Sequence, residues 1–175
     1  TLTISNNLNL PATTVLNFAL GTNASTVVST GALTLNATLN LSAANGFGPG
    51  SYRLFNYGAN RFGAPGLGAT PSTSGHAWLY NLQTNIGGQI NFVVAIPSPP
   101  VFDNVQLSDG TNLVMSGSST ATNLNYFILS STNVALPRNQ WSLVGSNQFN
   151  GSGGFSFTNV ISAEPSQNFF LLLYP

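Results

Sequence analysis

Residues 1–10 read Thr-Leu-Thr-Ile-Ser-Asn-Asn-Leu-Asn-Leu, and the apolar residues among them, Leu2, Ile4, Leu8 and Leu10, all fall at even positions. Every odd position of this stretch is polar. A period of two residues places alternate side chains on opposite faces of an extended chain, so the stretch predicts a β-strand with one polar and one apolar face. The apolar face needs a partner, either in the same domain or in a second copy of the chain.

The same alternation recurs through the whole sequence, and no stretch keeps apolar residues at helical spacing for three turns. We therefore expect an all-β protein. Gly, Asn and Pro signals separate the strands that this pattern predicts. In the first half they are residues 2–10, 15–20, 26–29, 32–35, 38–41, 52–57, 77–82 and 89–96, and in the second half 101–108, 112–116, 125–131, 141–145, 154–158 and 169–174.

The proline-rich stretch Ile96-Pro-Ser-Pro-Pro100 divides the chain, because proline cannot donate to a β-ladder and favours an extended spacer. We expect an N-terminal β domain over residues 1–96 and a C-terminal domain over 97–175. The fold class we predict is two small antiparallel β-sandwich modules. For the first module, a jelly-roll-like sandwich and a short β-solenoid both stay open. The short strands and regular turns of the second are typical of an immunoglobulin-like sandwich.

Composition limits the partners. Charged residues make up 3% of the chain, lysine is absent, and the formal net charge is zero, so there is no basic patch for nucleic acid or an anionic membrane surface. A hydrophobic content of 42% supplies enough apolar area for a core. The longest apolar run, residues 169–174, is too short to span a bilayer, which takes about 20 residues. Cysteine is absent, which excludes disulfides and thiolate chemistry.

Residues 58–75 form a long Gly/Pro-rich segment in which we expect no strand. Structureless loops longer than about 12–15 residues are uncommon in compact domains and are often functional. The segment either packs on its own domain through Phe62 and Leu67 or contacts another subunit through Arg61, Phe62 and Leu67.

The second half carries Leu129-Ser-Ser-Thr-Asn133, then Trp141, then a closing Gln167-Asn-Phe-Phe-Leu171. These residues resemble the small immunoglobulin/fibronectin-like sandwich module at the C-terminus of large secreted bacterial surface proteins. In the first half, Gly31 to Leu41, Gly50 to Tyr57 and Leu79 to Val94 are similar to the terminal unit of autotransporter-associated β-strand repeat proteins. The resemblances imply an exported, adhesive or scaffolding protein at the bacterial cell surface. Members of those families are much longer, whereas this sequence shows a single copy of each unit and no repeat array.

An enzyme is not expected, because the titratable groups are few: His76, Asp103, Asp109, Glu164 and three arginines. The sequence contains no Gly-x-Ser-x-Gly motif whose serine the single histidine could activate as a nucleophile. Asp109 precedes a glycine, and Asp-Gly is typical of a hairpin turn. Asp103 and Asp109 could offer oxygens to calcium, but no Asp-x-Asp-x-Asp run is present. We predict no catalytic residue, cofactor or metal site.

A carbohydrate-binding or adhesin module is the alternative function, because sugars stack on flat aromatic faces. Tyr57, Trp78 and Tyr80 are the candidate glycan platform, since Trp78 and Tyr80 share a strand face beside the long segment. Trp141 is a weaker candidate, because a tryptophan in a sandwich normally packs in the core.

Self-assembly is the function we expect. Monomeric proteins protect edge strands with lysine, other charges, proline or bulges, and this chain has almost no charge to do so. Without net charge, nothing repels a second copy. We predict a homopolymer, the structural subunit of an extracellular filament, joined by strand addition through Leu2, Ile4, Leu8 and Leu10, each worth roughly 1.5–3 kcal/mol when buried. Pairing of residues 1–10 within their own domain stays open.

Localisation follows from the same features: an extracellular chain at a bacterial cell surface, whose signal peptide has been removed. No membrane insertion is expected. Four Asn-x-Ser/Thr sequons are candidate glycosylation sites, at Asn23, Asn36, Asn40 and Asn150. Glycans and a host or cell surface are the further partners that this location allows.

Overall fold

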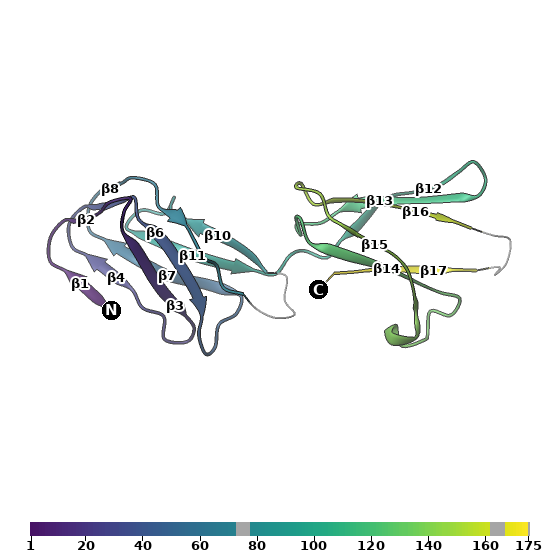
Figure 1. Cartoon of the computed structure of the whole chain (residues 1–175), viewed down its shortest axis with the longest axis horizontal. Coiled ribbons are helices and arrows are strands. Elements are labelled where there is room, and N and C mark those ends of the chain that lie inside the picture. The colour runs from purple at the N-terminus through teal and green to yellow at the C-terminus, as the bar shows by residue number, and fades with distance from the viewer. Residues whose placement is uncertain (73–77, 162–166, 175) are drawn as a thin grey trace. The chain divides into compact units, whose positions relative to one another are not determined.

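The structure is a computed structural model that describes residues 1–72, 78–161 and 167–174. It is all-β, which confirms the predicted class: its described part contains β-strands and one short 3-10 helix, η1 (Arg138–Gln140). The chain forms two compact units, and the division lies between Ile96 and Pro97 (Figure 1). We call them unit 1 and unit 2. Among the described residues, no helix has the length and apolar character that a membrane crossing requires.

Unit 1 winds through three coils, each made of three short strands. The first coil contains β1 (Leu2–Ile4), β2 (Leu8–Leu10) and β3 (Val15–Leu20), the second β4 (Val27–Ser29), β5 (Leu33–Leu35) and β6 (Thr38–Ala43), and the third β7 (Gly50–Tyr57), β8 (Arg61–Phe62) and β9 (Gly66–Leu67). Strands at the same place in successive coils pair in parallel, as β1-β4-β7, β2-β5-β8 and β3-β6-β9. Of the two architectures left open, the structure is the short β-solenoid.

The antiparallel pairing expected for the first module is therefore wrong for the pairs that these nine strands form with one another. A sandwich strand and a solenoid strand show the same two-residue alternation, and the difference lies in the partner. Here Leu8 pairs with Leu33, about one coil of 25 residues later, rather than with a strand across a tight turn. The long segment 58–75 was also mispredicted, because it holds β8 and β9. Two-residue strands are too short to show alternation.

The core of unit 1 lies inside the coils, where leucines stack level upon level. Leu33, Leu35 and Leu39 of the second coil are completely buried. Leu8 and Leu10 of the first coil pack against the same core, partly buried. Phe18 meets Phe55 edge to face, with ring centroids 5.6 Å apart. The middle coil is buried best because it has a coil on each side.

Asparagine side chains link successive coils. The side-chain oxygen of Asn7 accepts the backbone N–H of Ala32 at 2.8 Å, one coil further on. The Asn40 oxygen accepts the N–H of Ala69 at 3.0 Å, and its amide nitrogen donates to the Asn17 side chain at 3.1 Å. The bonds from Ala32 and Ala69 satisfy backbone N–H groups that lie outside the strands, where an unpaired group is costly, and the bond from Asn40 to Asn17 links β6 to β3.

An antiparallel hairpin extends the sheet beyond the third coil. β11 (Gln89–Ala95) pairs with β7, and β10 (Leu79–Gln83) pairs with β11, so the five-stranded order is β1-β4-β7-β11-β10. On the inner face, Ile90 and Phe92 are fully buried. On the outer face, Asn91 accepts from Arg53 Nε at 2.9 Å and donates to Gln83 at 3.0 Å. The hairpin occupies one of the three strand edges of the third coil.

Unit 2 consists of two three-stranded antiparallel sheets. The first has the order β12-β13-β16 and the second β15-β14-β17. The strand bounds are β12 (Val101–Ser108), β13 (Asn112–Ser118), β14 (Asn125–Ser131), β15 (Ser142–Gln148), β16 (Gly154–Val160) and β17 (Phe169–Leu173). The predicted turn at Asp109-Gly110 is confirmed: both residues have positive φ, 53° and 72°.

The core of unit 2 lies between these sheets and is rich in aromatic rings. Tyr126, Phe149 and Phe155 are buried and in mutual ring contact, with centroids 4.9–5.9 Å apart. The Tyr126 hydroxyl donates to the Ser156 carbonyl at 3.0 Å, which joins the two sheets. Burial raises the pKa of Tyr126 above its ordinary value, because the phenolate would be desolvated.

Trp141 does not take the core position expected of a sandwich tryptophan. It is half-buried outside the core cluster, and its indole N–H donates to the Leu136 carbonyl at 3.0 Å. Trp141 follows η1 and precedes β15, so it belongs to the connection between β14 and β15. The alternation of Trp141 with Leu143 failed to predict burial because β15 is an edge strand with exposed side chains.

Candidate functional site

Among the residues that the structure describes, the three strands of the first coil each have a neighbouring strand on one side only, at one end of the solenoid. β1, β2 and β3 are each the outermost strand of their sheet, and each pairs on one side only. Figure 1 shows β1 and β4 as successive strands at this end of unit 1. Because all three sides of the coil end at the same level, a surface of β-strand edges is formed there. We call it the coil-1 edge.

Backbone hydrogen bonds identify which groups of the coil-1 edge are free to pair. In a parallel ladder a residue directs its N–H and C=O to the same neighbour, and alternate residues serve opposite sides. Leu8 donates to the Ala32 carbonyl at 2.9 Å, and the Leu20 carbonyl accepts from Ala44 at 2.7 Å, so the inward-facing residues bond to the second coil. The backbone groups of the alternate residues therefore point away from it: Thr3, Asn9, Val15, Asn17 and Ala19.

The coil-1 edge carries no charged side chain, since residues 1–20 contain no Asp, Glu, Lys, Arg or His. The side chains of Asn9, Asn17 and Ala19 are exposed, and Val15 is 54% exposed. Lysines, prolines or bulges would normally protect such edges from other strands, and the three strands contain none of them. Chemically, the coil-1 edge can accept another β-strand through main-chain hydrogen bonds.

The four predicted interface side chains lie in the first coil, but they do not project from it. Residues 1–10 pair with their own domain, as the alternative interpretation allowed, through β4 and β5. Leu8 and Leu10 pack into the core of unit 1, Ile4 is half-buried, and only Leu2 is well exposed, at 59%. What remains available in this stretch is its backbone edge rather than its apolar face.

The other predicted interface residues lie in the third coil, two coils away. Arg61 and Phe62 form β8, and Leu67 is in β9. Phe62 is 54% exposed and Leu67 is 39% exposed. Arg61 and Leu67 line an open pocket of about 280 Å³ with Gly63, Ala64, Pro65, Leu82 and Thr84. The Arg61 guanidinium donates to the Gly63 carbonyl at 2.7 Å, so part of its bonding capacity is used within its own loop.

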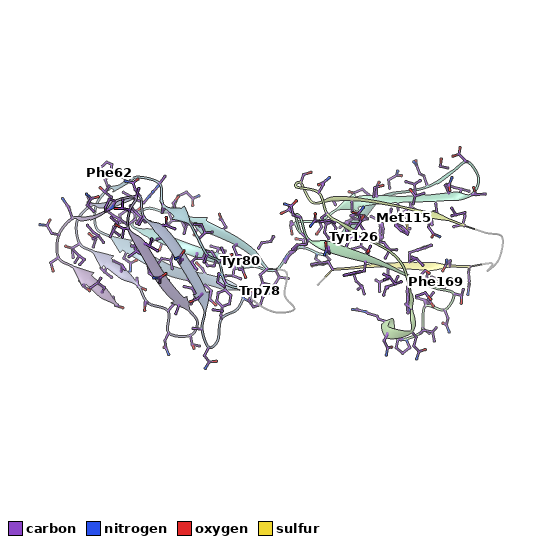
Figure 2. The ribbon with its side chains drawn as sticks, viewed as in Figure 1. Phe62, Trp78, Tyr80, Met115, Tyr126 and Phe169 are labelled. Carbon is purple, nitrogen blue, oxygen red and sulfur yellow. The ribbon has the colours of Figure 1, made fainter. Side chains whose placement is uncertain are left out.

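The three residues of the candidate glycan platform are not brought together. Tyr80 pairs with Val94, which pairs with Gly50 at the start of β7, whereas Tyr57 ends that strand. Seven residues of extended chain separate the two ends by about 23 Å. Tyr80 stacks on the buried Phe92 with centroids 5.3 Å apart. Trp78 packs against the same core (Figure 2). Both rings contribute to the core of unit 1.

The remaining candidates are dispersed. Asp103 accepts from the Ser118 hydroxyl at 2.9 Å, and Asp109 lies in its turn. His76 and Glu164 lie outside the described residues. Within the described ranges, no three His, Cys, Asp or Glu side chains gather at one place. Among the sequons, Asn23 is exposed, while Asn36, Asn40 and Asn150 accept backbone N–H bonds.

The expectation of no repeat array is also wrong, because three coils stack in unit 1. The repeat was present in the sequence as matching positions, Leu8 with Leu33 and Leu10 with Leu35, at one spacing. The first repeat is about 25 residues and the next about 28, which is the range of solenoid proteins. Unequal spacing hides such a repeat from a search at one fixed period.

Comparison of the chain with protein-family models, with curated proteins and with solved structures returned no match.

Proposed function

We propose that this chain is the structural subunit of an extracellular filament or surface fibre, and that its copies join by β-strand addition. The observation that supports the proposal is the coil-1 edge: three strand edges at one level, without charge or proline to block them. Strand addition uses main-chain hydrogen bonds for affinity and alternate side chains for register. The low charge content and zero net charge of the chain support the same function, since there is no net electrostatic repulsion between copies.

The energetics favour reversible assembly through this contact. Five residues of the coil-1 edge each offer one N–H and one C=O, and a net hydrogen bond contributes about 0.5–1.5 kcal/mol. About ten such bonds are of the same order as the 4–15 kcal/mol that association costs in lost freedom. The coil-1 edge therefore gives concentration-dependent pairing, and a long filament needs a second contact on each subunit.

The test compares a charge at the edge with the same charge one strand inward. Ala19 in β3 pairs with Ser42 in β6, and both side chains are exposed. We expect Ala19→Lys to abolish pairing through the coil-1 edge, because the lysine stands beside free backbone groups. Ser42→Lys should leave assembly unchanged, because both neighbours of β6 belong to the same chain. Val15→Pro is a second block, since it removes one edge N–H without removing a bond to the second coil.

Sedimentation velocity over a concentration series and negative-stain electron microscopy give the readout, with circular dichroism to verify the β-fold of each variant. Wild-type protein that stays monomeric at high concentration refutes the proposal. Equal effects of Ala19→Lys and Ser42→Lys would show that charge in general, rather than the coil-1 edge, controls the association.

A further inference from the structure

The sequence contains two Asn-Gly steps, Asn45-Gly46 between β6 and β7 and Asn150-Gly151 between β15 and β16. An asparagine that precedes glycine is chemically prone to lose its side-chain amide. The backbone nitrogen of the next residue attacks the side-chain carbonyl carbon, and glycine has no side chain to obstruct the approach. The structure holds these two asparagines very differently.

Asn45 lies at the exposed tip of a tight turn. The Phe47 N–H closes the turn by donating to the Ala44 carbonyl at 3.0 Å, and Gly46 has a φ of 78°, which glycine adopts without strain. The Asn45 side chain is exposed, and it makes no hydrogen bond with any residue that the structure describes. The Gly46 N–H is also unbonded within the described ranges. Both reacting groups are therefore free to approach each other.

Asn150 also precedes a glycine, but three donors hold its side-chain oxygen. The Ser152 N–H, the Ser152 hydroxyl and the Gly154 N–H donate to Asn150 Oδ1 at 3.0, 2.9 and 2.8 Å. The attacking nitrogen must approach the side-chain carbon from above the plane of the amide, and the amide turns to meet it only by giving up these bonds. Three hydrogen bonds of ordinary strength slow the reaction at least ~10-fold.

We propose that Asn45 is a site of spontaneous modification, where the folded chain converts an amide into an acid without an enzyme. The Gly46 nitrogen attacks Cγ of Asn45, so that a bond from this nitrogen to Cγ forms and the bond from Cγ to Nδ2 breaks. The proton of the Gly46 N–H leaves with the side-chain nitrogen as ammonia. Water then opens the five-membered succinimide ring at one of its two carbonyls, and the product is aspartate or isoaspartate.

The Asn45 carbonyl is part of the link between the first and second coils. It accepts the Thr22 backbone N–H and the Thr22 hydroxyl, both at 3.1 Å. These bonds continue the β3-β6 ladder beyond its last residue pair, Leu20 with Ala43. The approach is close, because a Cβ on Gly21 would lie 2.4 Å from the Asn45 carbonyl oxygen. A change in the backbone at residue 45 therefore acts directly on the junction of the two coils.

The two products change this junction in different ways. Aspartate keeps the main chain as it is and adds a carboxylate to an exposed side chain. Isoaspartate directs the main chain through Cβ and Cγ, which adds one atom to the backbone and converts the acceptor of both Thr22 bonds into a carboxylate on a branch. Phe47 limits how far the turn can shift, since its ring packs against Tyr52 and Trp78 with centroids 5.4 and 5.5 Å apart. We expect isoaspartate, but not aspartate, to weaken the junction.

Both products also change the charge of the chain. Residues 1–96 contain no aspartate or glutamate, so the modification gives this part of the chain its first acidic group. The whole chain has three basic and three acidic residues and a formal net charge of zero. One added negative charge is therefore resolved by isoelectric focusing, which separates the modified protein from the original.

The first test measures the rate at each asparagine by mass spectrometry. Trypsin cleaves after Arg53 and Arg138, so the two asparagines fall in different peptides. Folded protein is aged in mildly alkaline buffer, and each peptide is examined for replacement of NH₂ by OH, with electron-transfer dissociation to distinguish isoaspartate. We expect Asn45 to convert at least ~10-fold faster than Asn150 in the folded protein, and the two rates to become similar in urea. Equal rates in the folded protein, or no conversion at Asn45, overturn the inference.

The second test measures the consequence for unit 1 with two variants. Asn45→Gln blocks the reaction, because a longer side chain has to close a less favourable six-membered ring. Asn45→Asp supplies the charge without the extra backbone atom. Urea unfolding is followed by the fluorescence of Trp78, which belongs to unit 1, in a Trp141→Phe background.

The acidic fraction of aged protein that contains isoaspartate should unfold at about 0.5–1.5 M less urea, because the two Thr22 bonds are lost. Aged Asn45→Gln and freshly prepared Asn45→Asp should keep the original midpoint. An equal shift in either variant refutes the role of the Asn45 backbone in this junction. Neither measurement depends on association between copies, so its outcome is separate from that of the filament.

Discussion

A column of leucines runs through the three coils of unit 1, and its middle member is the sharpest place to test the solenoid. Leu39 of β6 pairs with Leu16 of β3 on one side and with Leu67 of β9 on the other. Leu39 is completely buried, whereas Leu67 is 39% exposed. Leu39→Ala and Leu67→Ala therefore make the same chemical change at two levels of one column.

The expected magnitudes follow from burial. A Leu→Ala change at a fully buried site lowers the free energy of unfolding by about 2–5 kcal/mol, because transfer energy is lost and a cavity remains. Leu39 has a coil above and a coil below, which limits collapse of the cavity, so we expect about 3–5 kcal/mol. The Leu67 site opens to solvent and can relax, so we expect about 1–2 kcal/mol there. For a domain of ordinary stability, about 5–15 kcal/mol, the first loss is a large fraction.

The assay uses the two tryptophans, since Trp78 belongs to unit 1 and Trp141 to unit 2. In a Trp141→Phe background, urea unfolding followed by fluorescence reports unit 1 alone. With an m-value of about 2 kcal/mol per M, Leu39→Ala should shift the midpoint by about 1.5–2.5 M and Leu67→Ala by about 0.5–1 M. Equal shifts for the two variants would refute the stacked core. In the reciprocal Trp78→Phe background Trp141 reports unit 2, and Leu39→Ala should leave that signal's midpoint unchanged, because Leu39 belongs to the core of unit 1.

Three further predictions concern single residues. The raised pKa of Tyr126 means that the folded unit 2 favours the neutral phenol, so its contribution to stability is complete below the ordinary tyrosine pKa of about 10 and is lost as the pH rises through the folded pKa. Urea titrations between pH 8 and 11.5 should therefore show the free energy of unfolding of unit 2 falling with pH. Tyr126→Phe should remove this pH dependence and cost about 1 kcal/mol of stability at neutral pH. Gly31→Ala should destabilise unit 1 by more than about 1 kcal/mol, since the new methyl carbon would lie 2.8 Å from the backbone nitrogen of Asn7 in the first coil. Gly48→Ala should be neutral, because Gly48 has open space around it. Thermal melting of the two variants compares their stabilities. Expressed in a glycosylating host, Asn23 should carry glycan and Asn40 should not, because the Asn40 amide nitrogen already donates to a neighbouring coil; peptide mass spectrometry would contradict this by finding Asn40 modified.

The strands were predictable from sequence, because alternation depends on which face of each strand is buried. Val15 to Leu20 illustrates this: Phe18 and Leu20 are buried, whereas Asn17 and Ala19 are exposed. The partner of each strand was not predictable in the same way. Alternation carries no information on whether Leu8 pairs with a neighbour in sequence or with Leu33 one coil later, since the register is fixed by packing between coils.

The candidate site was only partly predictable. The undefended edge of residues 1–10 could be inferred, because the missing charges are visible in the sequence. The sequence interpretation assigned the contact to the apolar face, whereas the apolar residues Leu8 and Leu10 face the core and the free groups belong to the backbone.

The parallel ladders make each level of unit 1 present to the next a similar row of backbone donors and acceptors. Only the last level differs, because the β10-β11 hairpin seals β7. The height of the column is therefore adjustable in whole turns. A duplicated coil inserted between β3 and β4 would find matching strand partners above and below it. Gene duplication or protein engineering could therefore lengthen unit 1 without a newly designed core.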